Sequence, residues 1–424
     1  MKRASIKEIA QLLGQNSSSQ TAICGYAIDS RMVQEGNLFF ALPGKKVDGL
    51  HFLREVASKK ASAAIVPKSY QGESFGLELI FVEDVRLALQ KLAKIAFLNC
   101  KGKVIAITGS VGKTTTKEFI AHLLSAKFKV FKTEGSFNSQ LSFPLGLLNL
   151  EGEFDIYVLE MGMTESGEIE RLVEIAPPDI AVITRIAIAH VGFFSDGIEG
   201  IAKAKAEILS HPKTKLAILS TQAHDFVKIA SAIKCEKRLY SIEDPILKTF
   251  LLPFSASHLQ ENFLAAYMVC KELGMTNEEI QAKAKDLKPY SLRFEIIQKE
   301  EVTFVKDCYN ANPESMRAAL LNLPQPQKLK RTIGILGSMV ELGKYSESSH
   351  RQIGELALTR VDELLCLGPD CQPMIDLFEK AGKKAALFSS LDLLKRKMEE
   401  CIQKGDVVLI KGSKVHQLWK LLED

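Results

Sequence analysis

The sequence has no paired cysteine motif, no long apolar run and no tract of clustered positive charge. Its eight cysteines are scattered and none forms a CxxC pair, so buried reduced thiols are favoured over disulfides or a zinc site. No uncharged apolar run approaches the roughly 18 residues of a membrane span, and the first residues lack the apolar stretch of a signal peptide. These absences predict a cytoplasmic protein with no membrane span.

The charge balance also bears on possible partners. The 55 basic and 51 acidic residues leave a net charge of +4, and no basic stretch is interleaved with aromatic residues. Nucleic acid is therefore not expected as the main partner, whereas a small anionic ligand needs only a local pocket.

What the chain does contain is the composition of a multidomain globular protein. Hydrophobic residues make up 46% and charged residues 25% of the 424 positions, and this length exceeds one ordinary core. Short apolar runs alternate with helical stretches, without internal repeats, which indicates α/β layers. We predict three α/β domains, at residues 1–83, at residues 84–292 around a parallel sheet, and at residues 293–424.

The expected elements follow from apolar periodicity and from the turn residues that bound each run. Helices are predicted over residues 51–60, 113–127 and 261–274. Strands are predicted over residues 22–31, 37–44, 61–67, 77–82, 103–109, 154–162, 179–190, 215–220, 302–307, 331–338, 362–369, 384–390 and 406–413. Ligands of open α/β sheets bind at the carboxyl ends of such strands.

A glycine-rich stretch, TGSVGKTTTKE at residues 108–118, ends a predicted strand and opens a predicted helix. Backbone N–H groups and the helix dipole favour phosphate in such a loop. Lys113 would reach the β- and γ-phosphates, and the Thr114 hydroxyl would bind Mg²⁺. The general GxxxxGK[ST] pattern has glycine where Ile107 stands, so this loop has the variant form TGxxGKTT. The alternative is an ordinary strand-to-helix turn.

Four other polar residues have both a functional and a structural interpretation. Glu160 ends an apolar strand, where it would ligate Mg²⁺ beside the phosphate loop or simply face water. His190 follows the next strand, and a lone histidine is more often structural or exposed. By composition, Lys205 lies on an ordinary solvated helix face, and Asn138 suits a turn with a local hydrogen bond.

The TGxxGKTT form resembles the phosphate loop of the Mur ligases, the ATP-dependent amide-forming enzymes of peptidoglycan synthesis. IDSRMVQEGNLFFALPGKKVDGLHF is similar to their first domain, LEMG, PPDIAVIT and AHVGFFSDGIEGIAKAKAEIL to their central domain, and GILGSMVELG and LIKGS to their last. The similarity spans nearly the whole chain. It implies a small N-terminal UDP-sugar domain, a central P-loop ATPase domain and a Rossmann-like C-terminal domain in a monomer.

One segment narrows the resemblance to a branch of the family. DCYNANPESM at residues 307–316 resembles the members that add D-alanyl-D-alanine (D-Ala-D-Ala) to a UDP-N-acetylmuramoyl-tripeptide, and the DNPR motif of the diamino-acid-adding members is absent. The resemblance implies that ATP phosphorylates the tripeptide carboxylate and that the dipeptide amine attacks the acyl phosphate. Mg²⁺, as two ions, would neutralise the developing charge. The third peptide residue remains either diaminopimelate or lysine.

The resemblance also assigns roles to matching residues. It implies catalysis by Lys113, Asn138, His190 and Lys205, and metal binding by Thr114, Glu160, His190 and Lys205, with Lys205 carbamoylated by CO₂ and Lys203 as the competing candidate. It implies nucleotide binding by Gly109, Ser110, Gly112, Lys113, Thr114, Thr115, Asn262, Arg293, Asp307 and Asn310, with His258 beside the base and Tyr309 in the last domain. It implies substrate binding by Ser30, Arg31, Asp48, Asn312 and Ser315.

Four positions depart from the family pattern. Arg185 stands where an asparagine usually precedes the metal histidine, Ser139 and Ser142 replace Asn and Gly, and Ser338 replaces Asp. Arg185 is the most consequential, because a cation beside two metal ions would weaken their binding or would itself contact phosphate. Activity is expected to survive, since the metal-site candidates are retained. Two alternatives stay open: a sibling ligase with another nucleotide-sugar or folate-like acceptor, and a nucleotide-binding regulator that no longer catalyses.

Overall fold

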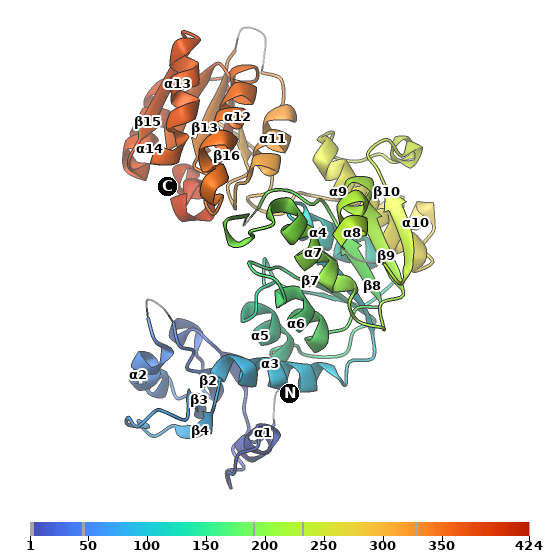
Figure 1. Ribbon diagram of the computed structural model, residues 1–424, viewed down its shortest axis with the longest axis vertical. Coiled ribbons are helices and arrows are strands. Elements are labelled where there is room, and N and C mark those ends of the chain that lie inside the picture. Colours follow the sequence, from blue (N-terminus) through green and yellow to red (C-terminus); the bar gives the residue numbers. More distant parts are fainter. Residues whose placement is uncertain (1–3, 45–46, 190, 231–232, 327–329, 424) are drawn as a thin grey trace.

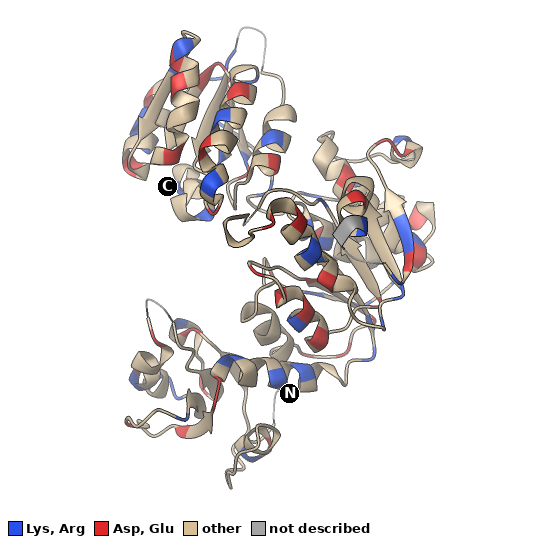
Figure 2. Cartoon of the chain, viewed as in Figure 1, with Lys and Arg blue, Asp and Glu red and all other residues tan. Residues whose placement is uncertain are grey.

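Three β-sheets follow one another along the chain in the computed structural model, which describes residues 4–44, 47–189, 191–230, 233–326 and 330–423. The first and last sheets lie at the two ends of an open arc, with the central sheet between them (Figure 1). Acidic and basic residues are interspersed over all three units (Figure 2). The expected α/β class is confirmed. No helix in the described ranges is long and apolar enough to cross a membrane.

The first unit has a four-stranded sheet in the order β1-β2-β3-β4, with every pair parallel. Its elements are α1 (Ile6–Leu12), β1 (Gly25–Ala27), β2 (Asn37–Phe40), α2 (Leu53–Ser58), β3 (Ala63–Pro67) and β4 (Glu78–Val82). The next helix, α3 (Val85–Phe97), starts at Asp84, whose carboxylate accepts the Leu87 N–H at 3.0 Å. It packs on β2 and β3 as well as on two helices of the central unit, so it joins the two units.

The central unit has a six-stranded parallel sheet in the order β10-β9-β8-β5-β7-β6. Alternate strand residues point to opposite faces, so Ile105 and Ile107 pack against one helical layer and Val104 and Ala106 against the other. The strands are β5 (Lys103–Thr108), β6 (Val130–Lys132), β7 (Ile156–Glu160), β8 (Ile180–Ile183), β9 (Leu216–Ser220) and β10 (Glu236–Tyr240). One layer contains α4 (Lys113–Leu124), α9 (Ser257–Glu272) and α10 (Asn277–Ala284), and the other contains α5 (Ser142–Leu148), α6 (Glu168–Ile175), α7 (Gly197–Ala206) and α8 (Thr221–Ala230).

The C-terminal unit has a six-stranded sheet in the order β11-β12-β16-β13-β14-β15, in which only β11 pairs antiparallel. The strands are β11 (Glu295–Lys299), β12 (Val302–Lys306), β13 (Thr332–Gly337), β14 (Glu363–Leu367), β15 (Lys384–Phe388) and β16 (Val407–Lys411). The helices are α11 (Pro313–Leu321), α12 (Ser346–Leu358), α13 (Gln372–Lys380) and α14 (Leu391–Cys401).

The strand expected over residues 179–190 was predicted too long, because β8 ends at Ile183. Beyond it the chain leaves the sheet to hold the glycine-rich loop. The Thr184 hydroxyl donates to the Thr108 and Val111 carbonyls at 3.2 and 2.6 Å, and Arg185 forms an isolated β-bridge with Val111. The end of β8 is therefore a support for the loop after β5.

Candidate active site

The loop between β5 and α4 has a shape that only glycine permits at two positions. Gly109 and Gly112 have φ angles of +147° and +87°. A Cβ atom at Gly109 would lie 1.9 Å from the Thr184 hydroxyl, and one at Gly112 would lie 2.5 Å from Asn262 Oδ1. Lys113 folds back so that its Nζ donates to the Gly109 carbonyl at 2.8 Å. The loop therefore has the glycine-dependent shape, and its lysine the position, that a phosphate-binding loop requires.

Ser110 fixes the loop to the segment after β8. Its N–H donates to the Arg185 carbonyl at 2.7 Å, and its hydroxyl donates to the Ala187 carbonyl at 2.8 Å. The same hydroxyl accepts the Ala187 N–H at 2.9 Å. Ser110 thus connects the phosphate loop to the segment after β8 by three hydrogen bonds.

A buried group of oxygen and amide atoms surrounds Glu160 at the end of β7. Glu160 is 1% exposed and accepts the Thr114 hydroxyl at 2.9 Å and the Asn138 amide at 2.6 Å. A carboxylate and a hydroxyl are the donors that Mg²⁺ prefers, so these side chains fit that ion. Within the described ranges, no cluster of three or more His, Cys, Asp or Glu side chains has metal-binding geometry. His190, another expected ligand, lies outside the described residues.

The two lysines of α7 that are candidates for carbamoylation differ in burial. Lys205 is 3% exposed, so the solvated-face interpretation is wrong for it. Lys203 has a side chain 54% exposed and lies 3.8 Å from Asp196. Burial, and then the charge of nearby Lys113, hold the pKa of Lys205 well below its usual value. This direction of shift favours the neutral form of the amine, which is the form that reacts with CO₂, relative to an exposed lysine.

Lys117 is a polar residue of the site that the sequence interpretation missed. It is 0% exposed, and its Nζ donates to the Thr133 carbonyl at 2.7 Å and to the Gly135 carbonyl. The same Nζ lies 4.0 Å from Glu160 Oε2. Lys117 follows Lys113 by one helical turn on the face of α4 that meets β6, and that spacing was the available signal.

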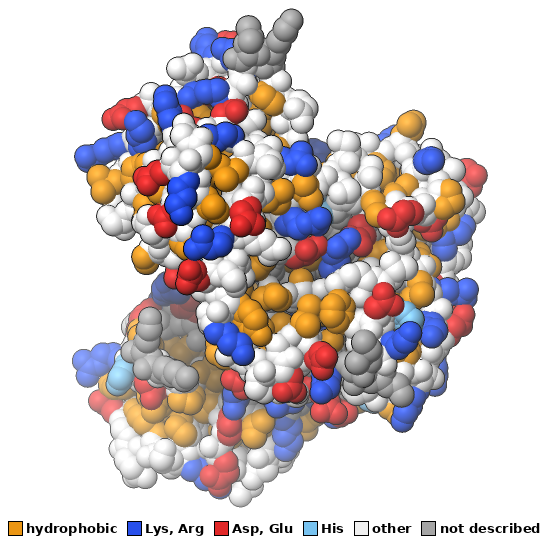
Figure 3. Space-filling model, turned by 45° about the horizontal axis from the view of Figure 1, so that its top comes forward, with side chains coloured by type: hydrophobic (Ala, Val, Ile, Leu, Met, Phe, Trp, Pro, Cys, Tyr) orange, Lys and Arg blue, Asp and Glu red, His pale blue; other side chains and the backbone are white. Residues whose placement is uncertain are grey.

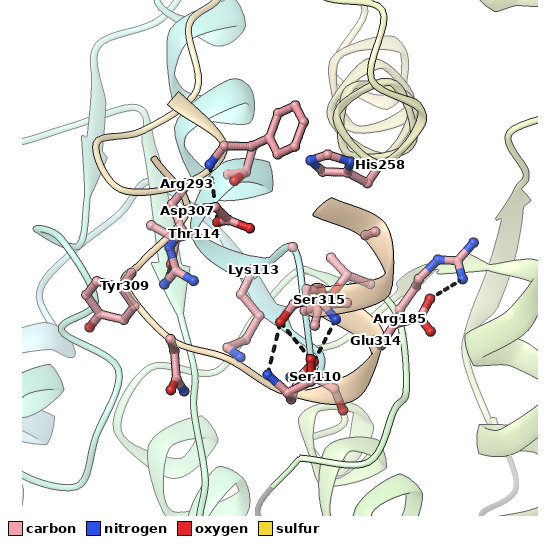
Figure 4. A pocket seen from close by; sticks show the side chains of 18 of the residues that line it. Ser110, Lys113, Thr114, Arg185, His258, Arg293, Asp307, Tyr309, Glu314 and Ser315 are labelled. Atoms are coloured by element: carbon pink, nitrogen blue, oxygen red, sulfur yellow. Dashed lines mark hydrogen bonds and ion pairs between the residues drawn. The ribbon is translucent and has the colours of Figure 1, made fainter. Parts of the chain in front are cut away.

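A cavity of about 470 Å³ opens between the central and C-terminal units. Figure 4 shows its lining side chains around Lys113 and Thr114, with Arg293, Asp307 and Tyr309 entering from the C-terminal unit. The predicted residues that it brings together are Ser110, Gly112, Lys113, Thr114, Thr115, Asn138, Glu160, His258, Asn262, Arg293, Asp307, Tyr309, Asn310, Asn312 and Ser315.

The C-terminal side chains of this cavity contact one another and the central unit. Arg293 Nη2 lies 3.4 Å from the Thr114 hydroxyl, and its guanidinium stacks 4.0 Å from the centre of the Tyr309 ring. Asp307 Oδ2 accepts from Lys411 Nζ at 2.7 Å. Desolvation lowers the pKa of His258 to about 4, against the opposing effect of Asp307, so His258 is neutral near pH 7.

A second cavity, of about 620 Å³, lies between the first and central units. Figure 3 shows the surface hollowed beside the first unit, with hydrophobic side chains inside the hollow. Lys113 and Asn138 line both cavities. From the first unit, Leu42, Pro43 and Pro67 line the second cavity.

The predicted substrate residues of the first unit do not line this second cavity. Ser30 donates to Glu55 at 3.0 Å, Arg31 pairs with Asp29 at 2.6 Å, and Asp48 accepts the N–H two residues ahead at 2.9 Å. Their side chains therefore contact other residues of the first unit.

The serines that depart from the family pattern have partners within this chain. The Ser139 and Ser142 hydroxyls lie 2.9 Å apart at the start of α5. The Ser338 hydroxyl lies 2.7 Å from His416 Nε2. The substitutions are therefore accommodated locally.

A phosphate loop at the end of the central strand of a parallel sheet, covered by a second α/β unit, defines a multidomain P-loop enzyme. Three family models match the chain: "Mur ligase family, catalytic domain" at residues 22–96, "Mur ligase middle domain" at residues 107–270 and "Mur ligase, glutamate ligase domain" at residues 292–414. The chain belongs to the Mur ligase family.

Relatives named UDP-N-acetylmuramoyl-tripeptide–D-alanyl-D-alanine ligase match along nearly their whole length. The Bacillus subtilis protein is 30% identical, with 100% of this chain and 98% of the relative covered. The Rickettsia prowazekii protein is 31% identical, with 98% of each covered. Among solved structures, MurF from Acinetobacter baumannii has a TM-score of 0.83 at 28% identity, covering 99% of this chain and 97% of the other. MurF ligase from Thermotoga maritima in complex with ADP has a TM-score of 0.79 at 29% identity, covering 94% and 96%.

Proposed function

We propose that this chain is an ATP-dependent ligase that joins D-Ala-D-Ala to UDP-N-acetylmuramoyl-tripeptide and releases ADP and phosphate. The observation that carries the proposal is the pair Lys113 and Asn138, which line both cavities. ATP in one cavity and the tripeptide carboxylate in the other would meet at these two side chains. The family membership and the names of the full-length relatives support the same reaction.

The reaction needs two steps that share one carboxyl carbon. A carboxylate oxygen of the tripeptide attacks the γ-phosphorus, and the bond to the ADP oxygen breaks. The dipeptide amine then attacks the carbonyl carbon and loses a proton, and phosphate leaves with one former carboxylate oxygen. Lys113 would hold the β- and γ-phosphates of ATP. Asn138 would orient the tripeptide carboxylate where the two cavities meet. Water must be excluded, because an acyl phosphate hydrolyses.

Mg²⁺, when bound, would neutralise charge on the transferring phosphoryl group. Thr114 and Glu160 would hold it through oxygen atoms, and the Asn138 amide donates a hydrogen bond that orients the Glu160 carboxylate. A carbamate on Lys205 would add two oxygens, and the low pKa of that buried amine supports its formation. His190 would serve as a further ligand, as the family resemblance implies.

The remaining residues divide between nucleotide and substrates. Arg293, Asp307, Asn310 and Asn262 would contact ATP, together with Gly109, Ser110, Gly112 and Thr115 in the loop. Asn312 and Ser315 at the start of α11 would contact the dipeptide. Ser30, Arg31 and Asp48 would bind the UDP end, which would extend beyond the second cavity towards the first unit. A monomer and a cytoplasmic location remain predictions.

Phosphate release tests this proposal directly. The complete mixture contains ATP, Mg²⁺, UDP-N-acetylmuramoyl-tripeptide and D-Ala-D-Ala, and each component is omitted in turn. Release should require all four and should accompany a UDP-muramoyl-pentapeptide. Release with another amine or nucleotide acceptor would indicate a sibling ligase. ATP binding without release in any mixture would indicate a regulator.

A further inference from the structure

The Arg185 side chain connects the central and C-terminal units. Its Nε donates to Glu261 Oε2 at 2.7 Å, and its Nη1 donates to Glu314 Oε1 at 2.9 Å. Glu261 belongs to α9 of the central unit, whereas Glu314 lies in the first turn of α11 in the C-terminal unit. One guanidinium therefore bridges carboxylates of two units, and Figure 4 shows its contact with Glu314.

This pairing changes the expectation for a cation at this position. In Figure 4 the Arg185 guanidinium points away from Lys113 and lies beside Glu314. The Arg185 side chain is 34% exposed and its partners 12% and 26%, so water screens the bridge only in part. With two carboxylates on one guanidinium, Arg185 is engaged in an ion-pair network and does not act as a free phosphate ligand.

The backbone of Arg185 is fixed to the phosphate loop. Its carbonyl accepts the Ser110 N–H at 2.7 Å, and it forms a β-bridge with Val111. A single residue thus contacts the phosphate loop through its backbone and the C-terminal unit through its side chain.

The first turn of α11 is well ordered by its own cap. Asn312 Oδ1 accepts the Ser315 N–H at 2.8 Å, and the Ser315 hydroxyl accepts the Asn312 N–H at 3.0 Å. Pro313 occupies the first helical position, where its fixed φ suits the helix. Because the turn is braced in this way, the position of Glu314 determines where Asn312 and Ser315 lie in the cavity.

We infer that Arg185 is a positioning residue, which sets α11 over the nucleotide cavity by its bridge to Glu314 and thereby places the groups that receive the dipeptide. The inference rests on the proposed ligase function. It gives a role to an arginine where the related enzymes usually have asparagine. The bridge would act on substrates that bind between the central and C-terminal units and would leave the UDP-tripeptide cavity unaffected.

Steady-state kinetics of Glu314→Gln test this role. KM for D-Ala-D-Ala should rise about tenfold through loss of placement, while KM for UDP-tripeptide stays at the wild-type value. Arg185→Lys should keep part of the effect, because it retains one charge contact. Arg185→Met combined with Glu314→Gln should have a KM for D-Ala-D-Ala no higher than that of Arg185→Met alone, as expected for partners in one interaction.

Glu174→Gln removes the surface pair with Lys94, at 2.8 Å, and serves as a matched control with wild-type kinetics.

Small-angle scattering gives a second measurement that does not depend on activity. The radius of gyration of Glu314→Gln should exceed that of the wild type at low salt, and high salt should bring the wild type towards the variant. Unchanged dipeptide KM and radius in Glu314→Gln would overturn the inference. So would an impaired Arg185→Met beside a normal Glu314→Gln, since Arg185 would then act at the phosphates. If the wild type lacks ligase activity but the radii differ as expected, the proposed function fails while the bridge stands.

Discussion

The two junctions between the three units are built from different interactions. Between the first and central units, α3 packs against α5 and α6, and β1 packs against α5. The Asn149 side chain forms two hydrogen bonds with the backbone of Tyr26. Its Oδ1 accepts the Tyr26 N–H at 3.0 Å, and its Nδ2 donates to the Tyr26 carbonyl at 2.9 Å. Buried apolar residues such as Leu89 and Leu92 of α3 complete this junction.

Polar contacts are prominent at the junction between the central and C-terminal units. One of them is the Arg185–Glu314 bridge. Two further contacts cross the same junction. Arg293 contacts Thr114, and the Ser257 N–H donates to Asn322 Oδ1 at 2.8 Å. Water replaces polar contacts at smaller cost than it replaces buried apolar ones. From this difference we expect the junction with the C-terminal unit to separate more readily than the junction with the first unit.

The largest expected effect comes from Lys113, one of the two residues that line both cavities. Lys113→Met should lower the rate of phosphate release by about 10³-fold, because the fixed cation at the transferring phosphate is lost. Lys127→Met, beyond the end of the same helix, should retain the wild-type rate. A Lys113→Met rate within a few fold of wild type would remove the basis for a shared site.

A smaller loss is expected from Lys117, which lies 4.0 Å from Glu160, a proposed Mg²⁺ ligand. Lys117→Met should weaken the apparent Mg²⁺ affinity about 10- to 100-fold, because the loop at Thr133 and Gly135, which lies beside Glu160, loses its anchor. A Mg²⁺ titration of activity measures this change. Lys404→Met, at an exposed lysine paired with Glu301 in the C-terminal unit, is the control. An unchanged Mg²⁺ dependence would show that Lys117 is only part of the core.

The contributions of the two junctions to the free energy of unfolding can be compared by replacing one asparagine at each. Asn149→Ala should lower the free energy of unfolding by about 1–3 kcal/mol, because the Tyr26 backbone groups lose their partners. Asn322→Ala, at the other junction, should lower it by less than about 1 kcal/mol, because its contact with Ser257 is exposed. Urea unfolding of both variants gives the two values. The reverse order would contradict the contrast between the junctions.

The smallest effect concerns pH and His258. Its folded pKa of about 4 lies below the unfolded value of 6.5, so the unfolded chain binds more protons and stability falls as pH drops through 6.5. Between pH 7 and pH 6 this linkage should remove about 0.7 kcal/mol from the wild type. His258→Gln should lack that loss. Equal pH dependence of urea unfolding in both proteins would show that His258 is not buried as a neutral ring.

The sequence predicted the α/β class and most strands, because their apolar runs are long and bounded by turns. It missed β6, β10 and β11, which lie at sheet edges and carry exposed polar residues, as in Glu236–Tyr240. It also missed the burial of Lys117 and the partners of Arg185. Glu314 is 129 positions from Arg185, and no local pattern reports a contact between two domains.

Isotope transfer from the acceptor to phosphate shows whether ATP phosphorylates the tripeptide carboxylate. UDP-N-acetylmuramoyl-tripeptide labelled with ¹⁸O in its reacting carboxylate is incubated with ATP, Mg²⁺, D-Ala-D-Ala and the enzyme, and the released phosphate is analysed by mass spectrometry. A carboxylate phosphorylated where the two cavities meet predicts one ¹⁸O atom in each phosphate. Phosphate without ¹⁸O would mean that ATP is hydrolysed by water, and it would contradict the account.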